Sequence, residues 1–80
     1  MRKSIRQPNH RILLKLLRAA RLEARLTQEE VALRLNRPQS FVSKYESGER
    51  RLDLIELREI CAVLGITLPQ FARRFDQACQ

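Results

Sequence analysis

Residue types that carry catalysis and metal binding are scarce in this sequence, which has one histidine and two cysteines among 80 residues. Cys61 and Cys79 are too few and too far apart for a disulfide scaffold or a Cys-x-x-Cys metal site. His10 has no second ligand-type residue nearby. The sequence also lacks a Ser/His/Asp set, a glycine-rich phosphate loop and paired carboxylates in an apolar setting. We therefore expect no enzyme, no cofactor and no metal site.

Long apolar runs are also missing. No segment approaches the roughly 18 consecutive apolar residues that suggest a membrane span. The N-terminal residues lack the apolar core of a signal peptide. A chain of 80 residues is enough for one small domain. These absences predict a cytoplasmic protein with reduced thiols and no membrane partner.

Turn-forming and aromatic residues are few: the chain has two glycines, three prolines, no tryptophan and 5% aromatic residues. The core must therefore rest on Leu, Ile, Val and Ala. The small number of glycines and prolines and the low content of β-branched residues favour helices over strands. The composition predicts an all-α fold.

Positive charge is concentrated at one end. The net charge is +7, and residues 1–25 hold eight cations and one anion, whereas the remainder balances to zero. A basic face beside a neutral body is the pattern expected of a polyanion binder. A solvated basic helix has the same composition, so the charge by itself does not separate the two interpretations.

Local signals place the helix ends. Residues 1–8 are expected to form a basic arm that ends at Pro8, after which residues 9–24 form the first helix, capped by Asn9. Capping boxes predict helices over 27–35 and 53–64, and a third start signal with a proline in its first turn opens a helix at 67. A helix over 39–47 follows the proline at 38 and ends at a glycine. We expect a five-helix domain over residues 9–76 and a frayed tail over 77–80.

Each expected helix has one apolar face. The residues predicted to point inward are Leu13, Leu17, Ala20, Ala24, Val31, Ala32, Leu35, Val42, Tyr45, Leu57, Ile60, Cys61, Leu64, Leu68, Phe71, Ala72 and Phe75.

The segment from Thr27 to Gly48 carries the functional signal. Two short helices joined by a tight turn cross at a large angle, which lets one of them enter a DNA major groove about 12 Å wide. The small Ala32 allows the two helices to pack closely. The outer side of the second helix has amide, hydroxyl and ammonium groups that suit base edges: Gln39, Ser40, Ser43 and Lys44. Such residues are equally usual on a solvated helix face.

Two runs carry a family resemblance: Leu26-Thr-Gln-Glu-Glu-Val-Ala-Leu-Arg-Leu and Pro38-Gln-Ser-Phe-Val-Ser-Lys-Tyr-Glu-Ser-Gly. They resemble the helix-turn-helix of the lambdoid Cro and repressor family, also called the xenobiotic-response-element (XRE) family, and the likeness extends over about residues 12–75. The resemblance implies a compact five-helix, lambda-repressor-like domain that binds double-stranded DNA in a sequence-specific way. It also implies a bacterial or phage protein associated with the nucleoid.

The resemblance implies roles for individual residues. The base-reading positions are Gln39, Ser40, Ser43 and Lys44. Gln28 matches a residue that holds a DNA phosphate and braces the recognition helix. It lies at the start of its helix, where the free N–H groups favour an anion such as phosphate. Arg50 and Arg51 lie where the family contacts backbone phosphates. Arg21 and Glu46 match a cation and a carboxylate that tie the first helix to the third; an accidental surface charge pair is the alternative interpretation.

The sequence departs from the family pattern at three positions. Asn36 replaces a turn glycine, and Pro38 stands where a capping Ser or Thr is common. Phe41 is bulkier than usual. It is expected to support the core against the fourth helix, with contact to a thymine methyl group as the alternative.

The predicted function is a transcriptional repressor that binds an operator as a homodimer, since one small module reads few base pairs. The dimer face is expected on residues 68–80, unless Phe71 and Phe75 both belong to the core. The alternative is an antitoxin that binds a protein toxin and represses its own operon. A membrane-surface binder based on the first helix is a third possibility, which the capped remainder of the chain argues against.

Overall fold

The computed structural model describes the backbone of residues 3–80 and the side chains from residue 8 onward. This part of the chain contains five helices joined by short loops. They are α1 (Lys3–Glu23), α2 (Gln28–Leu35), α3 (Gln39–Ser47), α4 (Leu54–Leu64) and α5 (Leu68–Ala78). No strand occurs in this part of the chain, which confirms the predicted all-α fold.

Capping boxes define where α2, α4 and α5 begin; those of α2 and α4 were predicted, and the start signal predicted at Thr67 is a third one. In the first of them the Thr27 hydroxyl accepts from the N–H of Glu30 at 3.1 Å, while the Glu30 carboxylate accepts from the N–H of Thr27 at 2.8 Å. The same reciprocal pattern joins Asp53 with Glu56 and Thr67 with Gln70. Because each box satisfies two backbone donors that the helix leaves free, these starts are sharp.

Left-handed residues end α2, α3 and α4. Asn36 adopts φ 59° and stands in for the glycine of the family pattern, as its tolerance of this conformation allows. Gly48 ends α3 with φ 91°. Pro38 occupies the N-cap position of α3 without a side-chain cap, which is the expected loss. The bounds of α2 and α3 therefore agree with the predicted helix-turn-helix.

The two ends of the chain are more helical than predicted. α1 begins at Lys3 and continues through Pro8, so the helix start expected at Asn9 is wrong; Met1 and Arg2 of the expected arm lie outside the described residues. Pro8 is the sixth residue of this 21-residue helix; it lacks the N–H that would bond to the carbonyl four residues earlier, and the helix continues through it. α5 reaches Ala78, two residues into the expected tail, because Gln77 and Ala78 are good helix formers and no helix breaker follows position 76.

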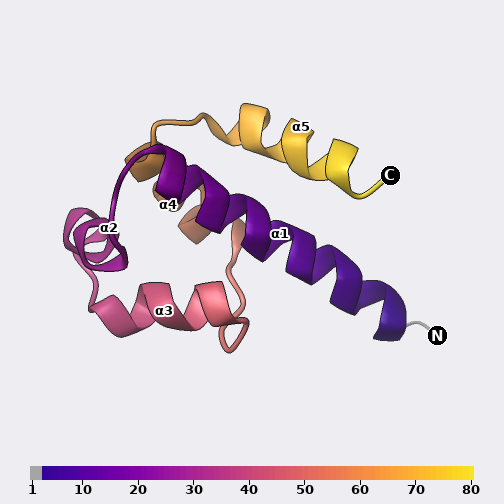
Figure 1. Cartoon of the computed structure of the whole chain (residues 1–80), viewed down its shortest axis with the longest axis horizontal. Coiled ribbons are helices and arrows are strands. Elements are labelled where there is room, and N and C mark those ends of the chain that lie inside the picture. The colour runs from indigo at the N-terminus through magenta and orange to yellow at the C-terminus, as the bar shows by residue number, and fades with distance from the viewer. Residues whose placement is uncertain (1–2) are drawn as a thin grey trace.

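The core lies where α1 passes between the other helices. In Figure 1, α1 runs through the middle of the molecule with α3 on one side and α5 on the other. α2 packs against both α3 and α4, and Ala32, only 2% exposed, lies in this packing as expected. The buried residues come from every helix and from the loop after α4: Leu17, Ala20, Val31, Ala32, Phe41, Val42, Tyr45, Ile60, Cys61, Leu64, Ile66 and Phe71.

α5 uses its apolar face within the domain. Phe71 is fully buried and Phe75 is half-buried, whereas Ala72, predicted to point inward, is exposed. The apolar face of α5 is therefore largely covered by α1 and α4. Among residues 3–80 no helix combines the length and the apolar character needed to cross a membrane.

Candidate nucleic-acid interface

The outer side of α3 is polar and open to solvent. Gln39, Ser40 and Lys44 are exposed and Ser43 is half-buried, while Phe41, Val42 and Tyr45 anchor the opposite side in the core. Ser43 bonds locally: its hydroxyl donates to the Ser40 carbonyl at 3.3 Å. The structure thus brings the four predicted base-reading residues together on one accessible helix face.

A buried ion pair holds α3 against α1. The Arg21 Nε donates to one carboxylate oxygen of Glu46 at 2.7 Å, and its Nη2 donates to the other at 3.1 Å. The two side chains are only 10% and 5% exposed. The hydrogen bond to Glu46 raises the pKa of Arg21, although burial alone would lower it. Arg21 and Glu46 therefore form the inter-helix contact that the resemblance implied.

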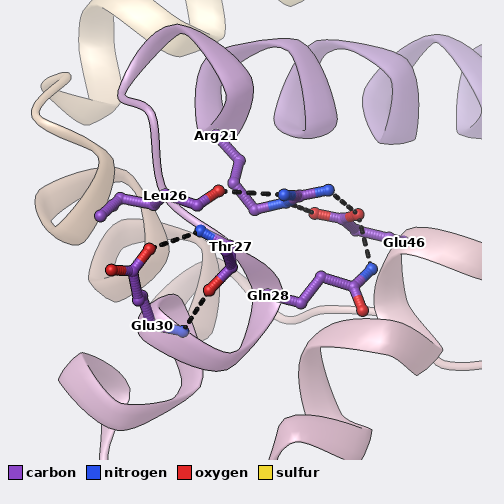
Figure 2. A network of polar contacts seen from close by, with 6 residues as sticks. All are labelled: Arg21, Leu26, Thr27, Gln28, Glu30 and Glu46. Carbon is purple, nitrogen blue, oxygen red and sulfur yellow. Dashed lines mark hydrogen bonds and ion pairs between the residues drawn. The ribbon is translucent and has the colours of Figure 1, made fainter.

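Two further contacts extend this ion pair to the turn before α2 (Figure 2). The Arg21 Nη1 donates to the Leu26 carbonyl at 3.0 Å, and the Gln28 Nε2 donates to a Glu46 oxygen at 2.9 Å. Glu46 thus receives donors from α1 and α2 at once. We call Arg21, Gln28, Glu46 and the Leu26 carbonyl the brace, because they connect three elements directly behind the exposed face of α3.

Arg50 has a partner that the sequence interpretation missed. Its Nη1 and Nη2 donate to the two oxygens of Glu56 at 3.0 and 2.8 Å, and Nη1 also donates to the Arg51 carbonyl at 2.9 Å. Much of its donor capacity is therefore used inside the chain, which distinguishes it from the exposed Arg51. The sequence marks Glu56 as the last residue of a capping box, six positions after Arg50, but a capping box predicts only its bond to the N–H of Asp53.

Phe41 supports the core instead of facing the groove. Its side chain is buried, and the guanidinium groups of Arg37 and Arg50 lie over its ring, 4.4 and 4.8 Å from the ring centroid. Both arginines also pair with Glu56. The expectation that Phe41 supports the core is therefore confirmed, and its exposed fraction of 7%, under a cover of two cations, leaves little surface for the alternative, contact with a thymine methyl group.

We expect the Arg50–Glu56 contact to make stability depend on acid pH. The hydrogen bond from Arg50 lowers the pKa of Glu56 to about 2, below its unfolded value of about 4.3. This contribution is complete above the unfolded pKa and is lost as the pH falls from about 5 toward 2. Urea unfolding at several pH values should show a flatter acid dependence for Glu56→Gln than for the wild type. The exposed Glu59→Gln is the matched control, and an unchanged dependence in Glu56→Gln would contradict the assignment.

A polar pocket lies between α1, α2 and α3, beside the exposed face of α3. It is lined by Arg18, Arg21, Gln28, Ser43, Glu46 and Ser47. The Gln28 side chain, predicted to hold a phosphate, borders this pocket while one of its N–H groups is used by Glu46. Bracing α3 and facing an anion are therefore compatible for Gln28.

An exposed polar helix held at a large angle by the preceding turn and helix defines a helix-turn-helix DNA-binding protein. The helix-turn-helix family model matches residues 17–71. Among solved structures, an XRE-family like protein from Pseudomonas syringae pv. tomato is 43% identical, with 95% of this chain and 93% of that chain covered and a TM-score of 0.90. No curated protein matches the chain. The chain belongs to the XRE family of helix-turn-helix transcription regulators, which bind DNA and are not enzymes.

Proposed function

We propose that the chain is a transcriptional repressor that reads an operator through the major groove with α3. The observation that carries this proposal is the combination of an open polar face on α3 with a buried brace directly behind it. A reading helix must be held within about 0.5 Å and roughly 10–20° of its productive position, and the brace supplies that support from two other helices.

In this proposal Gln39, Ser40, Ser43 and Lys44 contact base edges. Gln suits adenine, Lys suits guanine, and Ser suits either. Gln28 and the N-terminus of α2 hold a backbone phosphate, and the exposed Arg51 holds another. Arg50 contributes mainly by holding the loop after α3, and its contact with a phosphate competes with Glu56.

We further propose that two copies bind one operator. The nine residues of α3 reach few base pairs, so a specific site needs two half-sites about one helical turn apart. The similar XRE-family like protein comes from a bacterium, and we place this protein likewise in the cytoplasm of a bacterium or in a phage-infected cell. An adjacent toxin gene would favour the alternative, an antitoxin that binds a toxin and represses its own operon.

Replacing Gln39 or Lys44 with alanine is expected to weaken the preferred site by about 1–3 kcal/mol and to relax base preference at one or two positions. The physical reason is that each side chain donates to a particular base edge. The preferred site comes first from selection of bound DNA out of a random pool, which also returns its symmetry. Each variant is then measured against every single-base change of that site.

The matched control is Arg51→Ala, which should weaken all sequences nearly equally, because a phosphate contact carries no base information. If Gln39→Ala and Lys44→Ala leave the preference profile unchanged while Arg51→Ala reshapes it, the assignment of α3 as the reading helix is wrong. A pool from which no symmetric site emerges would contradict the proposed dimer.

A further inference from the structure

α1 carries a row of cations that neither the family pattern nor the proposed base and phosphate contacts use. Arg11, Lys15 and Arg18 are all exposed. Their spacing of four and three residues puts them on the same side of α1, one above the other. We call these three residues the α1 ridge.

The α1 ridge is continuous with the reading surface. Arg18 lines the same pocket as Gln28 and Ser43, so its side chain borders both the start of α2 and the outer side of α3. Leu14, the neighbour of Lys15 in the sequence, packs against Gly48 at the end of α3. Its Cδ1 lies 3.4 Å from the position that a Cβ at residue 48 would occupy. α1 therefore lies against the C-terminal end of α3 at Leu14. The ridge meets the reading surface at Arg18 and continues along α1 toward its N-terminus.

The ridge cations differ from three other arginines near α3. Arg21, Arg37 and Arg50 each pair with a glutamate, whereas no ion pair among the described residues involves Arg11, Lys15 or Arg18. Like charges three and four residues apart on a helix destabilise it by a few tenths of a kcal/mol per pair. The free chain thus holds a repulsive row whose charge a polyanion would neutralise.

We propose that the α1 ridge is a second anchor for the DNA backbone, which contacts phosphates that flank the base pairs read by α3. This inference rests on the proposed function, since DNA must lie against α3. Seven residues of helix span about 10 Å. One DNA strand carries a phosphate every 3.4 Å of helix axis, so a row of this length can contact more than one phosphate of a strand. Long flexible cations suit phosphates better than base edges, so the ridge adds affinity and lengthens the contacted site without reading sequence.

The test compares two variants that lose the same charge. Arg11→Gln/Lys15→Gln/Arg18→Gln removes the ridge. Arg58→Gln/Arg73→Gln/Arg74→Gln removes three exposed cations, one from α4 and two from α5, the helix that lies across α1 from α3. Both variants are checked for folding by thermal melting. Binding to the selected operator and to single-base variants of it is then measured at several salt concentrations.

The ridge variant is expected to bind on the order of a hundredfold more weakly at 0.1 M salt, with the slope of log K against log salt reduced by about 0.9 for each lost contact, or nearly three units per subunit. Its base preferences should stay those of the wild type, and ethylation of the flanking phosphates should no longer interfere with binding. The control variant should keep the wild-type slope.

If the slope of log K against log salt fell equally in both variants, the loss would reflect the total charge of the protein, and the proposed contact between the α1 ridge and the DNA backbone would be wrong. An unchanged slope in the ridge variant, or a changed base preference, would overturn it as well. These outcomes are distinct from failure of the proposed function, in which the wild type itself binds no DNA sequence selectively. Retained wild-type selectivity with an unaffected ridge variant would leave the reading by α3 intact and remove only the ridge.

Discussion

Replacing Glu46 with leucine is expected to lower the melting temperature by roughly 15 °C or more and to leave much of the protein unfolded near 37 °C. The substitution strands the Arg21 guanidinium, whose side chain is 10% exposed, and removes the acceptor of Gln28. Breaking a buried ion pair from one side costs about 3–5 kcal/mol, because an uncompensated charge stays behind. A domain of this size has only about 5 kcal/mol of total stability, or a little more.

The interaction itself is measured by a double-mutant cycle with Arg21→Met, Glu46→Leu and the double variant. Replacing both partners by apolar side chains removes the stranded charge, so the double variant is expected to be more stable than Glu46→Leu alone. Recovery should be partial, since the Leu26 carbonyl and Gln28 still lose their partner. Glu59→Leu, at an exposed position on α4, controls for the loss of one carboxylate. Additive effects of the two substitutions would show that the pair does not interact.

The second large effect concerns salt. Raising the salt concentration from 50 to 200 mM is expected to weaken operator binding by about a thousandfold or more, as is typical for six to ten phosphate contacts. We expect about four phosphate contacts per subunit, from Gln28, the N-terminus of α2, Arg51 and the loop around Arg51. The proposed dimer doubles that number. The loss arises because each neutralised phosphate releases counterions whose return is favoured at high salt.

The measurement is a series of equilibrium titrations with the selected operator and with a random duplex of the same length. Both should show steep salt dependence, since phosphate contacts are shared by all sequences. Gln28→Ala is less suitable as a contact variant because it also disturbs the brace, whereas Arg51→Ala changes the slope by about one unit per subunit without touching it. Affinity that barely changes over this range would mean that the basic surface does not meet the DNA backbone.

The helix ends show which parts of this fold can be predicted from sequence. The starts of α2, α4 and α5 and the ends of α2, α3 and α4 agree with their predicted positions, because a capping box or a left-handed residue acts within four residues of the chain. The predicted start of α1 is wrong, because Pro8 is a helix breaker by local rules and yet lies inside α1. The end of α1 carries no such signal: Arg25, neither glycine nor asparagine, takes the left-handed conformation there with φ 60°.

Contacts between residues that are distant in the sequence were harder to predict. Arg21 and Glu46 are 25 positions apart, and only the family resemblance suggested that they meet. The contact of Arg50 with Glu56 and the position of both arginines over Phe41 were not predicted, because they depend on how the loop after α3 folds back on α4. The charge of residues 1–25 was evident from the sequence, whereas its division into the braced Arg21 and the exposed α1 ridge was not.

The amino-acid sequence by itself determined the helical class, most helix ends, the apolar face of each helix and the family, because these depend on hydrogen bonds and periodicities within a few residues. The tertiary structure alone decided which polar residues are free to meet DNA. Helix crossing angles and packing distances place Glu46 within reach of α1 and α2, cover Phe41 with cations, and leave Gln39, Lys44 and Arg18 exposed around one surface. A charged side chain supports the fold when a partner from another helix lies within about 3 Å, and it is free to contact DNA when no such partner is there. That distance is a property of the packing.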